Sequence, residues 1–238
     1  MTRTLLSRRP GRLAGTLIAL AATVMALAAA PAQAAPLVAP SGLVMGFGCA
    51  TATPGQAHCL GELRAQPLAN GAKGLAPLLT AGPVGFGPPD LQSAYKVGGL
   101  TSGGRTVAIV DAFDDPKAEA DLGVYRNQYG LPACTTANGC FKKVNGAGQA
   151  SPLPTADPGW AEEESLDLDM VSSICPDCHI LLVEGAGADD ASLGAAEDTA
   201  AASAGVVAIS NSFGEAESSA ITGNDVHFNH PGKAITAS

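Results

Sequence analysis

A short apolar run, Thr106-Val107-Ala108-Ile109-Val110, decides the fold class of this chain and is followed at once by Asp111. The run is mostly β-branched and has no polar residue at alternate positions beyond its first residue. Such a run predicts a strand that is buried on both faces, as in a parallel sheet covered by helices.

Helix and strand signals alternate on the C-terminal side of this run. Asp-Pro pairs at 115–116 and 157–158 supply an N-cap and a first-turn proline, and Gly130 and Gly205 supply stop signals. The sequence therefore predicts helices over 115–129, 157–174 and 188–204, and further strands over 179–183, 206–209 and 234–237. This alternation predicts an α/β fold with a parallel sheet and helices on both faces, in which sites form at the carboxyl ends of strands.

The composition agrees with a globular α/β domain. The chain is 46% hydrophobic and 15% charged, which excludes disordered and coiled-coil classes. Its 13 Lys and Arg against 22 Asp and Glu give a net charge of −9, so we expect no nucleic-acid partner.

The N-terminus predicts export. Residues 1–34 combine a basic start, an apolar stretch over 13–30 and the small-residue motif Ala32-Gln33-Ala34, as a cleaved signal peptide does. The alternative is an uncleaved anchor, but the stretch is rich in Ala and ends in a cleavage motif. We expect a secreted protein with no membrane contact after cleavage, a Pro/Gly-rich extension over 35–88 and a domain over 89–238.

The six cysteines fit an extracellular protein. We expect disulfides between sequence neighbours, Cys49 with Cys59, Cys134 with Cys140 and Cys175 with Cys178. The last pair could instead be a redox motif or half of a zinc site. It precedes a predicted strand rather than opening a helix, and no second Cys pair accompanies it, so we expect no metal site.

An acidic helix carries the candidate chemistry. On a helical wheel for 160–174, the apolar residues Leu166, Met170, Val171 and Ile174 predict the core-facing stripe, with Glu163 and Asp167 in its middle. Glu162, Glu164 and Asp169 are predicted beside or away from it. Two buried carboxylates need a shared proton, which is the arrangement a general base uses.

Simpler interpretations of these acids stay open. An acidic first turn is favoured by the helix dipole, and this accounts for Glu162 and Glu164 but less well for Asp167. Asp111, at the end of the first strand, is a second candidate, although it could be an ordinary loop acid. Asp189 and Asp190 are predicted to cap a helix.

Four segments occur in the order and spacing of one known family: Leu91-Gln92-Ser93-Ala94-Tyr95, Thr106 to Asp111, Glu163-x-x-Leu166-Asp167 and Ser210-Asn211-Ser212-Phe213-Gly214. In them the chain resembles the sedolisin family of serine-carboxyl peptidases, secreted relatives of the subtilisins, over residues 89–238. The resemblance implies a subtilisin-like sheet and endopeptidase activity on proteins or peptides at acidic pH. It also implies that Glu163 is the general base, that Asp167 orients it, and that Ser210 to Gly214 line the substrate.

The chain departs from the family in two respects. The printed sequence stops at Ser238, before the blocks that carry the family's oxyanion Asp, nucleophilic Ser and calcium site. We therefore expect a sheet truncated on its C-terminal side, no cofactor in this chain, and no activity without the nucleophile. The extension is also shorter than the family's pro-segment. The alternative function is a non-catalytic secreted domain that binds peptides along Ser210 to Gly214 by strand addition.

Overall fold

The computed structural model describes residues 44–47, 49, 53, 55–67, 75–77, 85–216 and 221–237. All of these belong to the second of two compact units, which spans 40–238. The predicted signal peptide and much of the predicted extension lie outside the described residues. No helix in the described ranges is long and apolar enough to cross a membrane.

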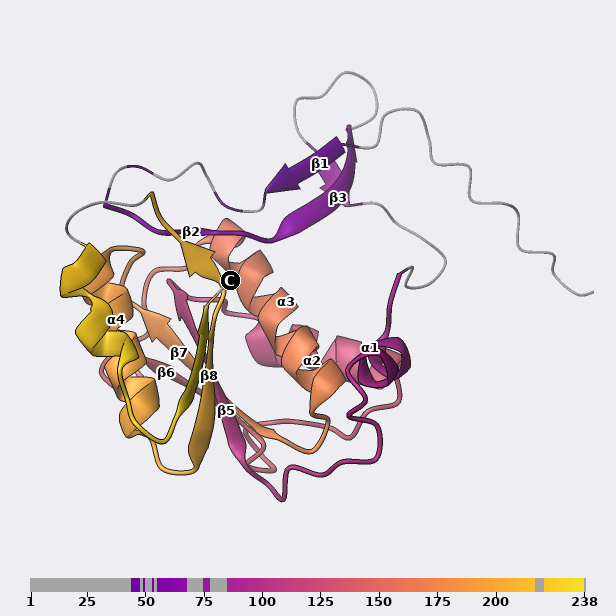
Figure 1. Ribbon diagram of the computed structural model, residues 1–238. Helices are drawn as coiled ribbons and strands as arrows, with labels where there is room; N and C mark the ends of the chain where they lie inside the picture. The colour runs from indigo at the N-terminus through magenta and orange to yellow at the C-terminus, as the bar shows by residue number, and fades with distance from the viewer. Residues whose placement is uncertain are drawn as a thin grey trace, which may run out of the picture. The chain divides into compact units, whose positions relative to one another are not determined.

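A five-stranded parallel sheet forms the centre of this unit, in the order β10-β8-β5-β7-β6 (Figure 1). The strands are β5 (Thr106–Ala112), β6 (Phe141–Asn145), β7 (His179–Gly185), β8 (Val206–Asn211) and β10 (Ala234–Ala237). The α/β prediction is confirmed, and four of these strands were predicted. The fifth, β6, was missed because two lysines interrupt its apolar pattern.

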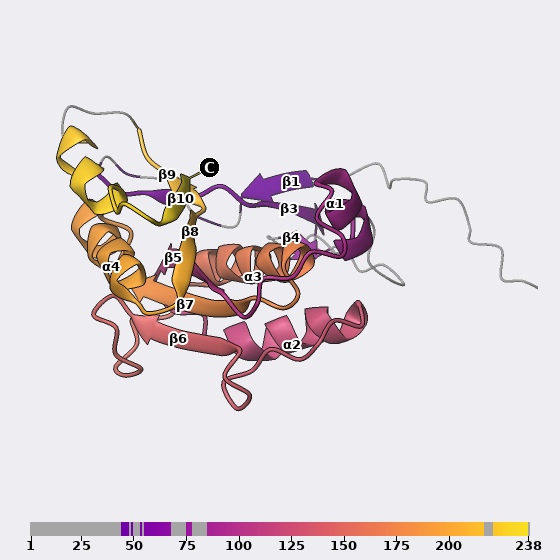
Figure 2. The same cartoon turned by 60° about the horizontal axis from the view of Figure 1, so that its bottom comes forward.

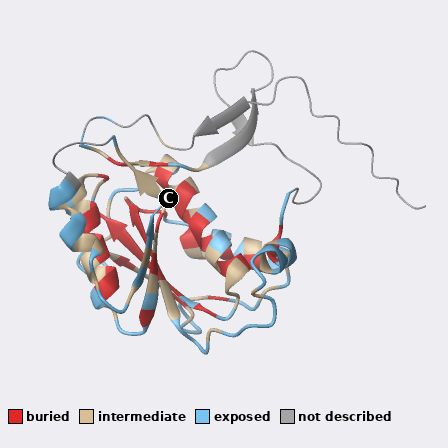
Figure 3. Cartoon of the chain, viewed as in Figure 1, coloured by how far each residue is buried: buried red, intermediate tan, exposed pale blue. Residues whose placement is uncertain are grey.

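Helices cover both faces of the sheet (Figure 2). The helix α4 (Asp190–Ala202) packs on the face that carries Ala108 and Val110, while α2 (Ala118–Gln128) and α3 (Pro158–Ile174) cover the face that carries Ile109. A short helix, α1 (Pro88–Ala94), lies against α3. Because neighbouring residues of β5 point to opposite faces, the sheet has an apolar core on each side (Figure 3).

The helix starts are only partly as predicted. Asp157 caps α3, and Asp189 caps α4, where its side chain accepts from the amide of Ser192. The helix expected from 115 instead begins at Ala118. Asp115 accepts a hydrogen bond from the Lys117 amide at 2.8 Å, so its side chain stabilises a turn in front of the helix.

The predicted core-facing stripe of α3 is only partly correct. Glu163 and Asp167, in the middle of the stripe, are buried, but Leu166 is 42% exposed and Met170 is 37% exposed, whereas Leu168 is buried. The helix is rotated from the predicted orientation because its inner face packs polar groups as well as apolar ones. Apolar spacing therefore placed the two carboxyl groups correctly and two of the apolar residues wrongly.

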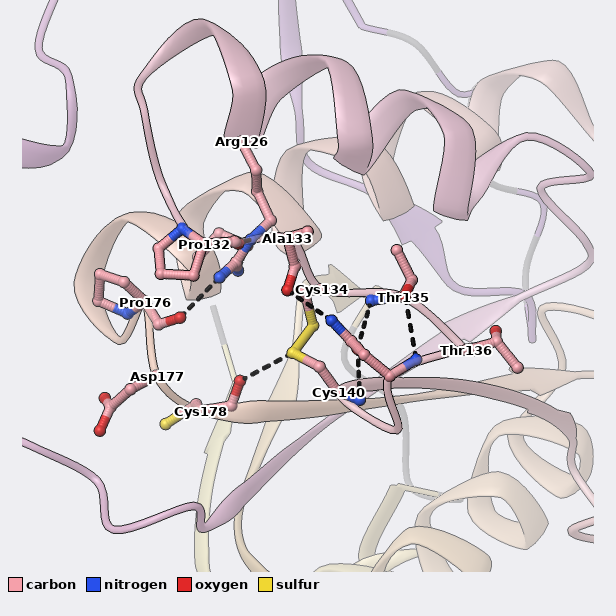
Figure 4. Close-up of a disulfide and its surroundings, with 12 residues drawn as sticks. Arg126, Pro132, Ala133, Cys134, Thr135, Thr136, Cys140, Pro176, Asp177 and Cys178 are labelled. Atoms are coloured by element: carbon pink, nitrogen blue, oxygen red, sulfur yellow. Dashed lines mark hydrogen bonds between the residues drawn. A yellow bond between two sulfur atoms is a disulfide. The ribbon is translucent and has the colours of Figure 1, made fainter.

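All three predicted disulfides are present, namely Cys49–Cys59, Cys134–Cys140 and Cys175–Cys178. The last two lie near a buried arginine (Figure 4). Arg126 donates to the carbonyl of Pro132 at 2.5 Å, to Ser172 Oγ at 2.9 Å and to the carbonyl of Pro176 at 2.6 Å. It thereby joins α2, α3, the segment just before Cys134 and the loop closed by Cys175–Cys178.

Short strands precede and follow this core. β2 (His58–Cys59) pairs antiparallel with β9 (Phe213–Gly214), which directly follows β8. A separate antiparallel sheet contains β1 (Val44–Phe47), β3 (Glu62–Pro67) and β4 (Leu75–Pro77). None of the strands in the predicted extension was expected. Two 3-10 helices, η2 (Ile221–Gly223) and η3 (Asp225–Phe228), lead to β10.

Candidate functional site

The candidate site lies where the parallel strands end, which is where such sheets form sites. Asp111, near the end of β5, is completely buried, and it is level with Glu184 of β7. Phe113 follows with a φ of 69°, a left-handed conformation that a bulky residue rarely adopts. Such local strain occurs often at functional sites.

An aromatic row crosses the same edge of the sheet. The ring of Trp160 on α3 lies 6.4 Å from that of Phe113 and 6.4 Å from that of Phe213, in tilted geometry. The row joins the end of β5, the first turn of α3 and β9. It fixes the start of α3, and with it the carboxyl groups of the following turn.

Glu163 and Asp167 lie one turn apart on α3, and both are buried. The cap on this helix sets their position, since Asp157 Oδ1 accepts from the amides of Gly159 and Trp160 at 2.9 and 3.0 Å. α3 packs against β5, so the structure brings both side chains to the strand end that carries Asp111.

The segment Ser210 to Gly214 lies beside this pair. Ser212 donates from Oγ to Asp167 Oδ1 at 2.8 Å, and Phe213 packs on Trp160. Asn211 is different, because it is buried in the sheet and donates from Nδ2 to the carbonyl of Thr236. The segment is therefore part structural and part site-lining.

Burial determines how the carboxyl groups titrate. Burial raises the pKa of Asp167 to about 7. The hydrogen bond from Ser212 lowers this pKa, and the charge of Glu163 adds to the rise. Burial also raises the pKa of Glu163, but the amides of Gly61 and Leu60 oppose that rise. The pKa of Asp111 is raised well above its usual value by burial and then by Asp167. Well below pH 7 the protonated form of Asp167 is therefore favoured.

Two of the acids predicted outside the core-facing stripe are buried or half-buried. Glu164 is completely buried, and burial together with Glu184 raises its pKa to about 10. Asp169 is half-buried, and burial raises its pKa to about 7. The spacing of Glu164 between Trp160 and Leu168, four residues to either side, is the signal that could have found it.

Glu184 of β7 is a site residue that the sequence did not reveal. It is fully buried and 3.0 Å from Lys143 Nζ, and Lys143 also pairs with Asp114. Burial raises the pKa of Glu184 to about 7 despite the lysine. A strand-end acid with its lysine on a neighbouring strand is invisible to local pattern analysis.

The described residues contain no cluster of three or more His, Cys, Asp or Glu arranged to hold a metal ion. His227 Nδ1 and His230 Nε2 instead lie 2.8 and 3.2 Å from the carboxylate of Asp198 on α4. Cys175 and Cys178 form a disulfide, so their thiols are not free to bind zinc. Two imidazoles and one carboxylate do not supply the set of oxygen ligands that calcium binds, so His227, His230 and Asp198 do not fit a calcium ion.

Among solved structures, the chain is similar to that of Pseudomonas sedolisin, a serine-carboxyl proteinase in complex with two molecules of pseudo-iodotyrostatin. The TM-score is 0.53 at 17% identity, over 67% of this chain and 45% of that one. The chain has a subtilisin-like fold. It spans less than half of that structure's length. No family model matches the sequence, and no curated protein matches it.

Within the subtilisin-like fold, Asp167 is hydrogen-bonded to Ser212 of the predicted substrate segment, and Glu163 lies one helical turn away from Asp167 on α3. Ser210 lies within β8, one residue before Asn211. A buried carboxyl pair at the end of a parallel sheet can accept and hold protons.

Proposed function

We propose that this chain carries the general base, and the acid that orients it, of a serine-carboxyl endopeptidase of sedolisin type. Such an enzyme would hydrolyse proteins or peptides at acidic pH. The observation that carries the proposal is the buried pair Glu163 and Asp167, one helical turn apart, with Asp167 bonded to Ser212 at 2.8 Å. The motif resemblance and the subtilisin-like fold support it from separate directions.

In this proposal Glu163 accepts the proton of a serine nucleophile, and Asp167 orients it. Asp167, with a pKa of about 7, stays protonated in acid and can donate a hydrogen bond to ionised Glu163. Above that pH both groups carry charge in a buried space and repel each other. Activity is therefore expected between the pKa of Glu163 and that of Asp167.

The nucleophile is not among the residues that we assign. The 238-residue chain contains no Gly-Thr-Ser triplet, so we expect it not to hydrolyse protein substrates by itself. The resemblance places the nucleophile, the oxyanion Asp and the calcium ligands in later blocks. A downstream reading frame that encodes these blocks would supply the rest of the catalytic site.

The test is to sequence the gene beyond codon 238 and to assay the longest encoded product on denatured casein across acid and neutral pH. The proposal expects hydrolysis with an acid maximum that Glu163→Gln abolishes and Asp121→Asn leaves intact. Asp121 is an exposed acid of α2. An alkaline maximum, or full activity in Glu163→Gln, would contradict it.

A second candidate is a non-catalytic secreted domain that binds peptides. The observation that favours it is the pairing of β9 with β2, since this edge already accepts an antiparallel strand. Peptide binding without hydrolysis by the longest encoded product would support this function over the first.

Both candidate functions assume that the protein is exported. The three disulfides fit an oxidising compartment, and residues 1–34 are expected to be removed. N-terminal sequencing of the exported product should find Ala35 first. A cell-retained product with an intact N-terminus would contradict this.

A further inference from the structure

A buried acid of α4, Glu197, has no role in the site described above. Its side chain is completely buried, and neither carboxyl oxygen has a hydrogen-bond partner among the described residues. The neighbouring buried residues of α4, Ala196 and Ala200, pack in the apolar core with Ile209 of β8. A buried carboxyl group without a partner is costly, so a partner for Glu197 has to come from the groups beside it.

The polar group beside Glu197 is the side-chain amide of Asn211, the last residue of β8. Asn211 comes two residues after Ile209 and therefore points to the same face of the sheet, toward α4. Its Nδ2 donates to the carbonyl of Thr236 on β10 at 3.1 Å. Its Oδ1 is buried and has no partner among the described residues. Two unpaired acceptor groups therefore lie side by side in the core.

One proton satisfies both groups. A protonated carboxyl group has one O–H donor, whereas the side-chain oxygen of an asparagine is only an acceptor. Burial raises the pKa of Glu197 from 4.5 to about 7, and the amide of Asn211 opposes that rise. In acid Glu197 therefore carries the proton that Asn211 Oδ1 needs. Above about pH 7 the carboxylate can only accept, and Oδ1 loses its donor.

Charged groups around Glu197 come from two elements. On α4 itself the charge of Asp198 adds to the rise in the pKa of Glu197, and His227 of η3 opposes it. His227 and His230 both contact Asp198. The ring of His227 lies on α4 at Gly194, where a Cβ would come within 2.7 Å of it. The residues of β5 and β7 that pack against this side of α4 are apolar and bring no charge.

The position of Asn211 matters because Ser212 follows it directly. β8 ends at Asn211, and Ser212 then donates to Asp167 at 2.8 Å on the other side of the sheet. We propose that Glu197 is a positioning residue, whose carboxyl proton binds Asn211 Oδ1 and holds the end of β8 in place. Ser212 is thereby kept against Asp167 while Glu197 is protonated. This inference rests on the proposed function only in giving Asp167 a role in catalysis.

The first test follows the side-chain NH2 signals of Asn211 by NMR as the pH is raised. In the unmodified chain we expect these signals to shift with a midpoint near pH 7. Glu197→Gln should remove most of the shift, because the glutamine amide donates a hydrogen bond at every pH. The matched control is Asp121→Asn, at an exposed acid of α2, which should leave the shift intact. Signals that do not respond to pH, or that respond equally in Glu197→Gln, would overturn the inference.

Asp167 titrates in the same range, so the second test is made in an Asp167→Asn chain. There the backbone amide of Ser212 should still shift near pH 7, and adding Glu197→Gln should remove that response. A Ser212 amide that no longer responds once Asp167 is replaced would show that Glu197 does not act on Ser212. That result would overturn the inference and leave the proposed function standing, because loss of hydrolysis in Glu163→Gln tests the function separately.

The variant Glu197→Leu gives the third test, because it removes the donor at every pH. The bond from Ser212 lowers the pKa of Asp167, so loosening Ser212 should raise that pKa by at least about half a pH unit. Glu197→Gln should leave it close to its value in the unmodified chain. An unchanged pKa in Glu197→Leu, or an equal rise in Glu197→Gln, would overturn the inference. If Glu197→Leu does not fold, the comparison of Glu197→Gln with the unmodified chain decides.

Discussion

Ser212 and Asp167, which are 45 residues apart in the sequence, are joined by a 2.8 Å hydrogen bond from Oγ to Oδ1. The bond connects the segment after β8 to the middle of α3. The other oxygen of Asp167, Oδ2, is buried without a hydrogen-bond partner among the described residues. The titration of Asp167 therefore reports directly on this contact.

Removing the hydroxyl should raise the pKa of Asp167. The Ser212 hydrogen bond favours the ionised carboxylate, so Ser212→Ala should move the pKa above its present value of about 7. Carboxyl NMR titration measures the change, and Ser210→Ala is the matched control from the same segment. A pKa that stays the same or falls in Ser212→Ala would show that the bond does not form in solution.

The chain should be more stable in acid than at neutral pH. Glu164 has a folded pKa of about 10 against an ordinary value of 4.5, so between these values the folded state holds a proton that the unfolded state has lost. The stabilisation that Glu164 contributes is therefore fully present below its unfolded pKa and is lost as the pH rises toward its folded pKa. Glu184 and Asp167, both raised to about 7, act in the same direction.

Glu164→Gln should flatten this dependence. One proton fewer in the folded state reduces the slope by about 1.4 kcal/mol per pH unit between roughly pH 5 and pH 9. Urea unfolding at several pH values measures it, with the exposed Asp225→Asn as control. A slope equal to that of the unmodified chain would mean that Glu164 ionises freely in the folded state.

Arg126 should be required for stability. Arg126→Ala leaves buried Ser172 and the carbonyl groups of Pro132 and Pro176 without their donor, which we expect to cost about 3 kcal/mol in the free energy of unfolding. Arg126→Lys should recover only part of this, because an ammonium cannot reproduce the planar fork. The exposed Arg105→Ala is the control in the same urea experiment, and equal losses in the two alanine variants would refute the role.

Opening the Cys49–Cys59 disulfide should loosen the segment Gln56 to Gly61. The double variant Cys49→Ala with Cys59→Ala removes the closed loop, and hydrogen exchange at Gly61 should accelerate more than in the matched variant that lacks Cys134–Cys140. Slower or unchanged exchange at Gly61 would show that this segment is held by packing of Ala57 and its neighbours alone.

Local sequence signals predicted most of the sheet and the helices. The β-branched run of β5 and the capping residues Asp157 and Asp189 sufficed, because they act within one element. β6 was missed because Lys143 is held in the sheet by Glu184, a residue about 40 positions later in the chain. Ion pairs between strands leave no periodic signal in either segment.

The candidate site was only half visible in the sequence. Glu163 and Asp167 could be singled out by spacing and resemblance, but the apolar stripe used to orient α3 pointed outward at Leu166. The contact of Gly61 with Glu163 could not be predicted, since Gly61 lies in a Pro/Gly-rich segment and its backbone amide rather than a side chain makes the contact. Contacts of this kind depend on tertiary packing.

The central claim is that Glu163 and Asp167 titrate as one coupled base and acid pair, and carboxyl NMR titration of the chain tests it most directly. In the unmodified chain Asp167 should release its proton near pH 7, after Glu163 has ionised, and Glu163→Gln should lower the pKa of Asp167 by removing the neighbouring charge. An Asp167 that titrates near its ordinary value of 3.8, unchanged by Glu163→Gln, would contradict the account.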